Sequence, residues 1–245
     1  MVQRRENTPS TPGPVGLVGS GEFLPQMDEV DAMLLAGRRP RVAILATAAG
    51  LEGPETVSRW LDMGSRHFAA LGAEPVPLPV MNADDADDER YAAQIAGVGL
   101  VYLSGGNPAH LAATLRDSAV WRAVSAAWHA GAALAGCSAG AMALSAEAPS
   151  VRHATNEAGL ALVGHVAVIP HFDRIANWDE TFLGRRVAQP RSGVTLVGID
   201  EDTALVGGPE HWTVMGRRTV TVFGENGPTV HQAGARLILP LPASR

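Results

Sequence analysis

The first half of the chain alternates short apolar runs with amphipathic stretches, a pattern typical of strands followed by helices. The apolar runs predict strands at residues 15–19, 41–47, 74–79, 98–103 and 132–135, of which the first two are expected to be buried. The third of these runs contains prolines, which cannot donate in a central ladder, so we expect it at an edge of the sheet. Strands that alternate with helices predict a mostly parallel sheet with helices on both faces, an α/β fold.

Between the strands, the spacing of apolar residues predicts helices. They are expected at residues 25–36 and 54–71, from the acidic run 84–89 onward, in two segments before residue 132, and at 139–144 and 179–188. The acidic run suits a helix N-terminus, where negative charge is stabilised by the helix dipole.

The second half of the chain has a different pattern. Apolar runs at residues 166–170, 195–199, 203–206, 211–215 and 219–223 are mostly too close together for intervening helices. They predict a C-terminal antiparallel β extension of the same domain. The opening residues 1–13 are polar and rich in proline and threonine, so we expect a disordered tail before one α/β domain over residues 14–245.

Composition narrows the classes of function. The chain has 245 residues, of which 46% are hydrophobic, and its formal net charge is −6, which argues against nucleic acid or an anionic membrane as partner. The uncharged stretch 123–146 has too few large apolar side chains for a membrane span. One cysteine excludes a disulfide framework within the chain. With no apolar segment behind the basic start, we expect a cytoplasmic protein.

A strand, then Gly136-Cys-Ser-Ala-Gly140, then a helix is the arrangement of a nucleophile turn. Small residues beside Ser138 allow the strained backbone that exposes its hydroxyl group, and the following helix aims N–H groups at the same place. A Gly/Ala-rich packing turn would have the same pattern. A glutamine amidotransferase would put cysteine at the apex, whereas here Cys137 precedes the apex and is expected to be a small buried residue.

A second glycine-rich loop, Ser104-Gly-Gly-Asn-Pro108, follows the strand at 98–103. Neighbouring parallel strands end at the same edge of a sheet, so this loop is expected beside Ser138. Glycine there can adopt the backbone angle that turns an N–H group toward the site, although a plain turn before a helix is the alternative.

A serine nucleophile needs a base and a group that orients the base. The chain has eight histidines. His171 directly follows the strand at 166–170 and is the favoured base among them. For the acid, Glu147 is nearer to Ser138 in sequence, Asp173 is nearer to His171, and Glu157 lies between the two.

Five segments together resemble the serine peptidase family of aspartyl dipeptidase (dipeptidase E) and cyanophycinase, whose fold is similar to class I glutamine amidotransferases. These segments are GGNP at 105–108, GCSAGA at 136–141, TNE at 155–157, PHFDR at 170–174 and GIDEDTAL at 198–205. The resemblance implies Ser138 as nucleophile, His171 as base, Glu157 as acid, and an oxyanion hole from the N–H groups of Gly106 and Ala139.

The same resemblance implies hydrolysis of a peptide or isopeptide bond next to an aspartyl residue, with no metal or cofactor. A substrate carboxylate favours arginine at the site, for which Arg174, Arg185 and Arg186 are candidates, together with Asn107 from the glycine-rich loop. The segment after Phe172 matches no specificity signature of the characterised relatives, so the substrate stays open.

Two other interpretations are left open by the sequence. One is an esterase or amidase with the same triad, and the other is an amidotransferase-like domain that binds a ligand without turnover. Oligomeric state is also undecided: Trp121 and Trp128 are scattered surface-apolar candidates for a homodimer contact.

Overall fold

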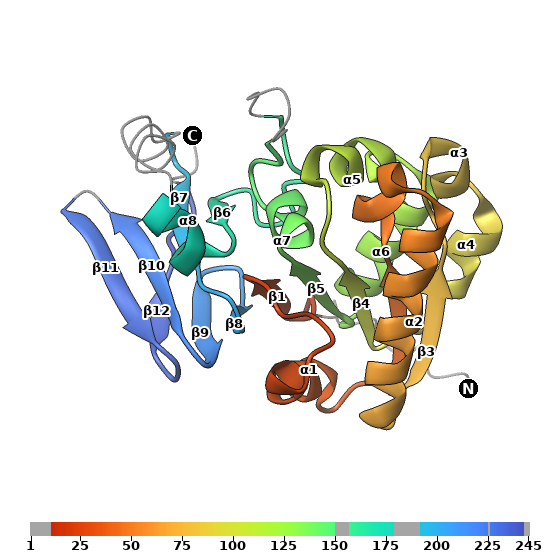
Figure 1. The fold of residues 1–245 in the computed structure, drawn as a ribbon, viewed down its shortest axis with the longest axis horizontal. Coiled ribbons are helices and arrows are strands. Elements are labelled where there is room, and N and C mark those ends of the chain that lie inside the picture. Colours follow the sequence, from red (N-terminus) through yellow and green to blue (C-terminus); the bar gives the residue numbers. More distant parts are fainter. Residues whose placement is uncertain (1–10, 150–156, 179–191, 225, 243–245) are drawn as a thin grey trace, which may run out of the picture.

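A computed structural model describes residues 11–149, 157–178, 192–224 and 226–242 of the chain. Its strands form two sheets (Figure 1), one of eight strands in the order β12-β9-β8-β1-β5-β4-β2-β3 and one of four in the order β11-β10-β7-β6. The expected tail falls largely on residues 1–10, which lie outside the described residues. Gly13, at its end, exchanges hydrogen bonds with Trp128 of helix α6 (Ala119–His129).

In the larger sheet, the five strands that come first in the sequence pair with one another in parallel. These strands are β1 (Val15–Val18), β2 (Arg41–Leu45), β3 (Glu74–Leu78), β4 (Leu100–Leu103) and β5 (Ala133–Cys137). The proline-containing β3 occupies the edge, as its missing N–H donors require. The antiparallel strands β8 (Thr203–Gly207), β9 (His211–Gly216) and β12 (Arg236–Ile238) complete the sheet beyond β1.

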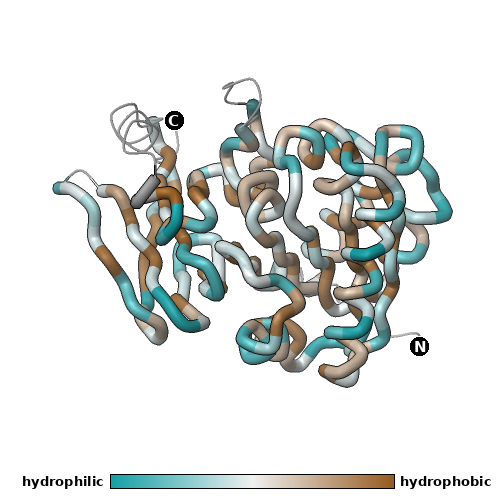
Figure 2. Tube along the Cα trace, viewed as in Figure 1, coloured by the Kyte–Doolittle hydropathy of each residue, from teal (hydrophilic) through white to brown (hydrophobic). Residues whose placement is uncertain are grey.

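Helices cover both faces of the larger sheet, and each face has its own cluster of buried apolar residues. One face packs against α1 (Asp28–Leu35) and α2 (Pro54–Ala70). The other packs against α3 (Ala83–Ala86), α4 (Glu89–Gln94), α5 (Pro108–Leu115), α6 (Ala119–His129) and α7 (Ala139–Leu144). Short 3-10 turns, η1 (Pro25–Met27) and η2 (Thr47–Glu52), precede α1 and α2. Figure 2 shows the apolar residues concentrated in the interior strands.

The expected mostly parallel α/β sheet with an antiparallel C-terminal extension is confirmed, but the extension is divided between two sheets. Strands β6 (Val166–Ile169), β7 (Thr195–Ile199), β10 (Thr219–Gly224) and β11 (Gly227–Gln232) form the smaller sheet. Helix α8 (Phe172–Trp178) follows β6. The helix expected at 179–188 lies outside the described residues.

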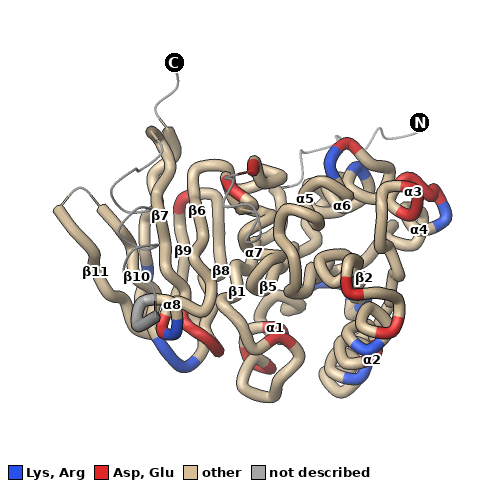
Figure 3. Tube along the Cα trace, turned by 45° about the horizontal axis from the view of Figure 1, so that its top comes forward, with Lys and Arg blue, Asp and Glu red and all other residues tan. Residues whose placement is uncertain are grey.

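The acidic run also differs in detail from the expected single helix start. Asp88 caps α4 by accepting a hydrogen bond from the N–H of Arg90, so the run is divided between α3 and α4. Strands β1, β4 and β5 carry no charged residue, and most charged residues of the described ranges lie on helices and loops (Figure 3).

The two sheets are joined by the tight turn 200–202, because β7 belongs to the smaller sheet and β8 to the larger. Gly19, at the end of β1, packs directly against this turn. A methyl group on Gly19 would lie 2.1 Å from the carbonyl oxygen of Asp200 and 2.6 Å from that of Ile199. The close approach of backbone to backbone therefore depends on glycine at this position.

Candidate active site

Ser138 stands on a strained turn between β5 and α7. Its φ of 50° and ψ of −107° are unusual for a residue with a side chain. The flanking glycines make the turn possible: a methyl group on Gly136 would lie 2.4 Å from the backbone of Gly140, and one on Gly140 would lie 2.3 Å from the carbonyl oxygen of Leu103. The backbone geometry is that of a nucleophile turn, with the serine half-buried at its apex.

His171 faces this serine from the smaller sheet. Its Nε2 lies 3.1 Å from the hydroxyl oxygen of Ser138. The residue directly precedes α8 and has a φ of 50°, so its backbone is held in the left-handed region as well. Phe172 secures this bend, because its ring covers Gly198 of β7 so closely that a methyl group there would lie 2.4 Å from a ring carbon.

The other ring nitrogen of His171 is bonded to Glu201, in the turn that joins the two sheets. The distance from Nδ1 to Oε1 of Glu201 is 3.1 Å. The sequence favoured Glu157 for this role, but Glu157 is exposed beside the isolated bridge between Glu147 and Ala158. Instead, the carboxylate of Glu201 is the hydrogen-bond partner of Nδ1. Topology explains the difference, since the β7–β8 turn reaches the end of β6, where His171 lies.

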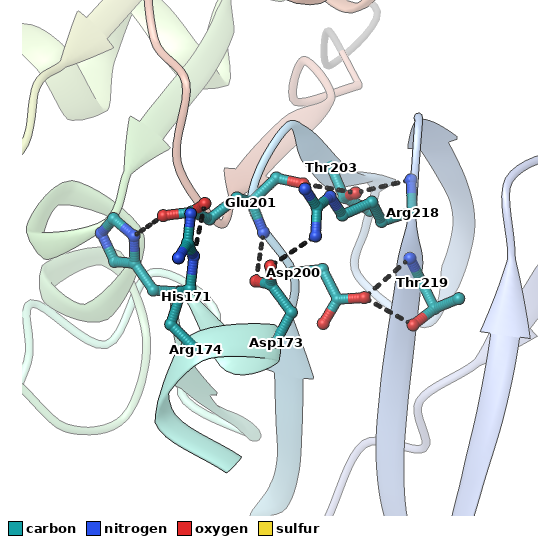
Figure 4. Close-up of polar contacts among 8 residues, drawn as sticks. All are labelled: His171, Asp173, Arg174, Asp200, Glu201, Thr203, Arg218 and Thr219. Carbon is teal, nitrogen blue, oxygen red and sulfur yellow. Dashed lines mark hydrogen bonds and ion pairs between the residues drawn. The ribbon is translucent and has the colours of Figure 1, made fainter. Parts of the chain in front are cut away.

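Three further groups fix the position of Glu201 (Figure 4). Arg174 donates from Nε to Oε2 of Glu201 at 3.2 Å. Asp173 accepts a hydrogen bond from the backbone N–H of Glu201 at 2.9 Å, and its other oxygen accepts from Arg218 at 2.6 Å. The hydrogen bond from His171 lowers the pKa of Glu201; partial burial opposes this, and Arg174 lowers it further. The carboxylate is therefore kept ionised beside the imidazole.

The glycine-rich loop after β4 lies next to the serine, as expected. A methyl group on Gly105 would lie 3.5 Å from Cβ of Ser138. Gly106 has a φ of 139° and abuts the backbone of Ala48, so only glycine fits there. Within the described part of the chain, no hydrogen-bond acceptor is assigned to the N–H of Gly106 or of Ala139, the first residue of α7.

The candidate substrate-binding residues lie in different places. Asn107 caps α5, because its side-chain oxygen accepts a hydrogen bond from the N–H of His110 at 3.0 Å. Arg174 lies at the site on Glu201, with 59% of its side chain exposed. Arg185 and Arg186 lie outside the described residues. Cys137 is fully buried below the turn, as expected, and burial raises its pKa well above the ordinary value, as does the neighbouring Glu22.

Neither a metal site nor a membrane span is found in the described ranges. No group of three or more His, Cys, Asp or Glu side chains in these ranges could hold a metal ion. In the same part of the chain, no helix combines the length and apolar character needed to cross a bilayer.

Two residues at the site were not identified from the sequence. Glu201 lies within the GIDEDTAL segment, where three consecutive acids at a strand end were the available signal. Glu22, buried under the glycine-rich loop, follows the glycine-rich exit from β1, where an acidic residue among apolar neighbours was the signal. Neither signal points to the site until the strand order is known, because the pairing of β1 with β5 and β8 is what brings these residues close to Ser138 and His171.

Comparison with known proteins gives consistent results. The model of peptidase family S51 matches residues 16–214. A crystal structure of a peptidase from an acI-B1 Actinobacterium is 34% identical, with a TM-score of 0.86, covering 94% of this chain and 98% of that one. A putative peptidase E protein from Listeria monocytogenes EGD-e has the same fold at 16% identity, with a TM-score of 0.60 and coverage of 91% and 100%. No curated protein sequence matches the chain.

The family match covers most of the chain and includes both strand ends that carry Ser138 and His171. With the structural relatives, it identifies the protein as a hydrolase of peptide bonds. The chain belongs to peptidase family S51, the serine peptidases of the dipeptidase E type.

Proposed function

We propose that the protein cleaves a peptide or isopeptide bond next to an aspartyl residue, using Ser138, His171 and Glu201 as its catalytic triad. The observation that carries the proposal is the continuous chain of contacts from Ser138 Oγ to His171 Nε2 and from His171 Nδ1 to Glu201, each 3.1 Å long. Glu201 takes the place that the sequence favoured for Glu157.

The contacts support a definite distribution of protons. An ionised carboxylate can only accept a hydrogen bond, so Nδ1 of His171 carries the hydrogen that faces Glu201. Nε2 is then free to accept the proton of Ser138. This is the arrangement that makes a serine hydroxyl group nucleophilic.

The reaction proceeds by acyl transfer. Ser138 Oγ attacks the substrate carbonyl carbon as its proton passes to His171, and the N–H groups of Gly106 and Ala139 stabilise the oxyanion. His171 then gives the proton to the departing amine as the carbon–nitrogen bond breaks. Water, deprotonated by His171, attacks the acyl group and releases Ser138.

The preference for aspartate rests on charge at the site and on the family resemblance. Arg174 uses Nε to bind Glu201, while more than half of its side chain is exposed. A guanidinium group in that position suits a substrate carboxylate. Hydrolysis of Asp-Leu compared with Asn-Leu, which has the same shape without the charge, measures the preference. Equal kcat/KM for the two dipeptides would rule out recognition of the carboxylate.

The nucleophile is tested with a fluorophosphonate probe and peptide mass spectrometry. We expect the probe to form one adduct, on Ser138, and to form none in Ser138→Ala. In His171→Ala, the rate of labelling is expected to fall by about 10³-fold. A well-folded wild-type protein that neither reacts with the probe nor hydrolyses aspartyl dipeptides would contradict the proposal.

The assignment of the acid is tested by a matched pair of variants, Glu201→Gln and Glu157→Gln. Loss of the carboxylate that orients the base costs about 10⁴-fold in kcat in a serine triad, so Glu201→Gln is expected to lower kcat by about 10³- to 10⁴-fold. Glu157→Gln is expected to stay within about threefold of wild type. The reverse order of the two effects would return the role to Glu157.

A further inference from the structure

Glu22 is a buried carboxylate that the proposed triad does not use. It lies in the loop that leaves β1, and only 9% of the residue is exposed. The residue after it, Phe23, has a φ of 63°, an uncommon backbone angle for a side chain of this size. The ring of Phe23 packs against Tyr102 and Phe68, which anchors the bend that turns Glu22 inward. A buried carboxylate held by a strained backbone calls for a physical reason.

Each oxygen of Glu22 contacts a different segment of the active site. Oε1 accepts a hydrogen bond from the backbone N–H of Gly105 at 3.0 Å. Oε2 lies 2.9 Å from Sγ of Cys137, directly before the nucleophile. Burial and the nearby carboxylate raise the pKa of Cys137, so the thiol stays protonated and donates to Oε2. The carboxylate therefore bridges the glycine-rich loop and the nucleophile turn.

The bond to Gly105 has a direct geometric consequence for the next peptide. Gly105 is held by Glu22 from below, and the N–H of Asn107 donates to the carbonyl oxygen of Ala48 at 2.8 Å. Gly106 lies between these two fixed points with a φ of 139°. The direction of its N–H group, which has no assigned acceptor among the described residues, is set by its two neighbours.

We propose that Glu22 is a positioning residue for the oxyanion hole: by holding the N–H of Gly105 beside the nucleophile turn, it aims the N–H of Gly106 at the substrate oxyanion. The inference rests on the proposed function, because an oxyanion forms only if Ser138 attacks a carbonyl group. Glu22 does not touch the substrate. It acts on the transition state, since the oxyanion develops after binding.

The test compares Glu22→Met, which keeps the volume but loses the strong acceptor, with Glu22→Gln, which keeps an oxygen for Gly105. Hydrolysis of aspartyl p-nitroanilide is measured over a range of concentrations, with thermal unfolding recorded for each variant. Loss of one oxyanion donor costs about 10²- to 10³-fold in kcat. We expect Glu22→Met to lower kcat by about 10²-fold with KM within threefold of wild type, and Glu22→Gln to keep kcat within about tenfold.

If the role of Glu22 were purely structural, its substitution would lower the unfolding temperature and change both kcat and KM, instead of lowering kcat alone. Equal kcat for folded Glu22→Met and Glu22→Gln would overturn the inference. If Glu22→Met does not fold, Glu22→Asp replaces it, because the shorter side chain keeps the charge but does not reach Gly105. An Asp variant with the kcat of Glu22→Gln would also overturn it.

The outcome for wild type separates the two proposals. If the wild type hydrolyses the anilide and Glu22→Met, Glu22→Asp and Glu22→Gln have the same kcat, the role of Glu22 is refuted and the proposed function is not. A folded wild-type protein with no turnover and no fluorophosphonate adduct would refute the proposed function, and the oxyanion role with it.

Discussion

Single residues in this molecule carry backbone strain where the chemistry is concentrated. Ser138 and His171 both have a φ of 50°, and their side chains meet across the boundary between the sheets. Such conformations cost on the order of 1–3 kcal/mol each and persist only where the surroundings enforce them. At Ser138 the enforcement comes from flanking glycines, and at His171 it comes from the packing of Phe172 on Gly198.

Arg174 provides a prediction about pH at the residue scale. Because the pKa of Glu201 is lowered in the folded state, its carboxylate stabilises the fold at pH values above its ordinary pKa of 4.5. This stabilisation is lost as the pH falls through the lower pKa of the folded state. In Arg174→Gln the pKa of Glu201 moves up toward the ordinary value. The variant is expected to lose about 0.5 kcal/mol of unfolding free energy at pH 7, because the pair is partly exposed.

The difference between wild type and Arg174→Gln should shrink toward zero as pH falls below 4.5, when measured by urea unfolding at several pH values. Arg122→Gln serves as control, since its guanidinium lies 3.9 Å from Glu89 and both side chains are largely exposed. A difference between wild type and Arg174→Gln that grows on acidification would contradict this role of Arg174.

At the scale of elements, the junction between β6, α8 and β7 determines where His171, the proposed base, lies. Phe172 starts α8, and its ring occupies the space above Gly198 of β7. The new methyl group in Gly198→Ala would overlap this ring at 2.4 Å, so α8 must shift and carry His171 with it. Overpacking of this kind costs about 1–3 kcal/mol, and we expect kcat to fall by at least about tenfold.

The matched control for Gly198→Ala is Gly224→Ala at the end of the neighbouring β10. Among the described residues, the atom nearest to a methyl group on Gly224 is the carbonyl oxygen of Gly227, 3.8 Å away, which is ordinary contact. Unfolding free energy and kcat of this control should stay close to wild type. Wild-type kcat in folded Gly198→Ala would show that Phe172 does not hold His171 in place.

The elements that sequence could predict were those with a strong apolar signal. Four of the five parallel strands, β1, β2, β4 and β5, stood out because they are buried on both faces, whereas the half-exposed β3 showed its edge position by its prolines. The exposed edge strand β11 has no such pattern, and β12 is only three residues long, so neither was predicted. Ser138 and His171 lie directly after apolar runs, which made them visible. Glu201 was missed because its distance to His171 depends on how β7 and β8 divide between sheets, which local spacing does not reveal.

At the scale of the whole molecule, the proposed triad is divided between the two sheets. Ser138 follows a strand of the larger sheet and His171 one of the smaller, while Glu201 lies in the turn that joins them. The relative position of the sheets is therefore part of the catalytic geometry.

Gly19→Ala tests this dependence, because its methyl group would press β1 against the turn that carries Glu201. The overlaps of 2.1 and 2.6 Å are with backbone oxygens, which cannot rotate away. A displacement of about 1 Å costs on the order of 10²-fold in rate. We expect a loss of that size in kcat and a lower unfolding temperature. Gly16→Ala on the same strand meets the movable side chain of Leu34 at 3.0 Å and should be milder. Equal kcat in the two variants would argue against the close packing of β1 on the turn.

The position of β1 has a consequence for synthesis on the ribosome. It emerges before the other strands of the described residues, yet it lies between β5 and β8, so Val15 pairs with Leu134 on one side and with Gly207 on the other. Pairings so distant in sequence form late and slow folding. The turn with Glu201 emerges just before β8, so an incomplete chain lacks the proposed acid and one partner of its first strand at the same time. A nascent chain is therefore expected to lack the complete proposed triad until the β7–β8 turn and β8 have emerged.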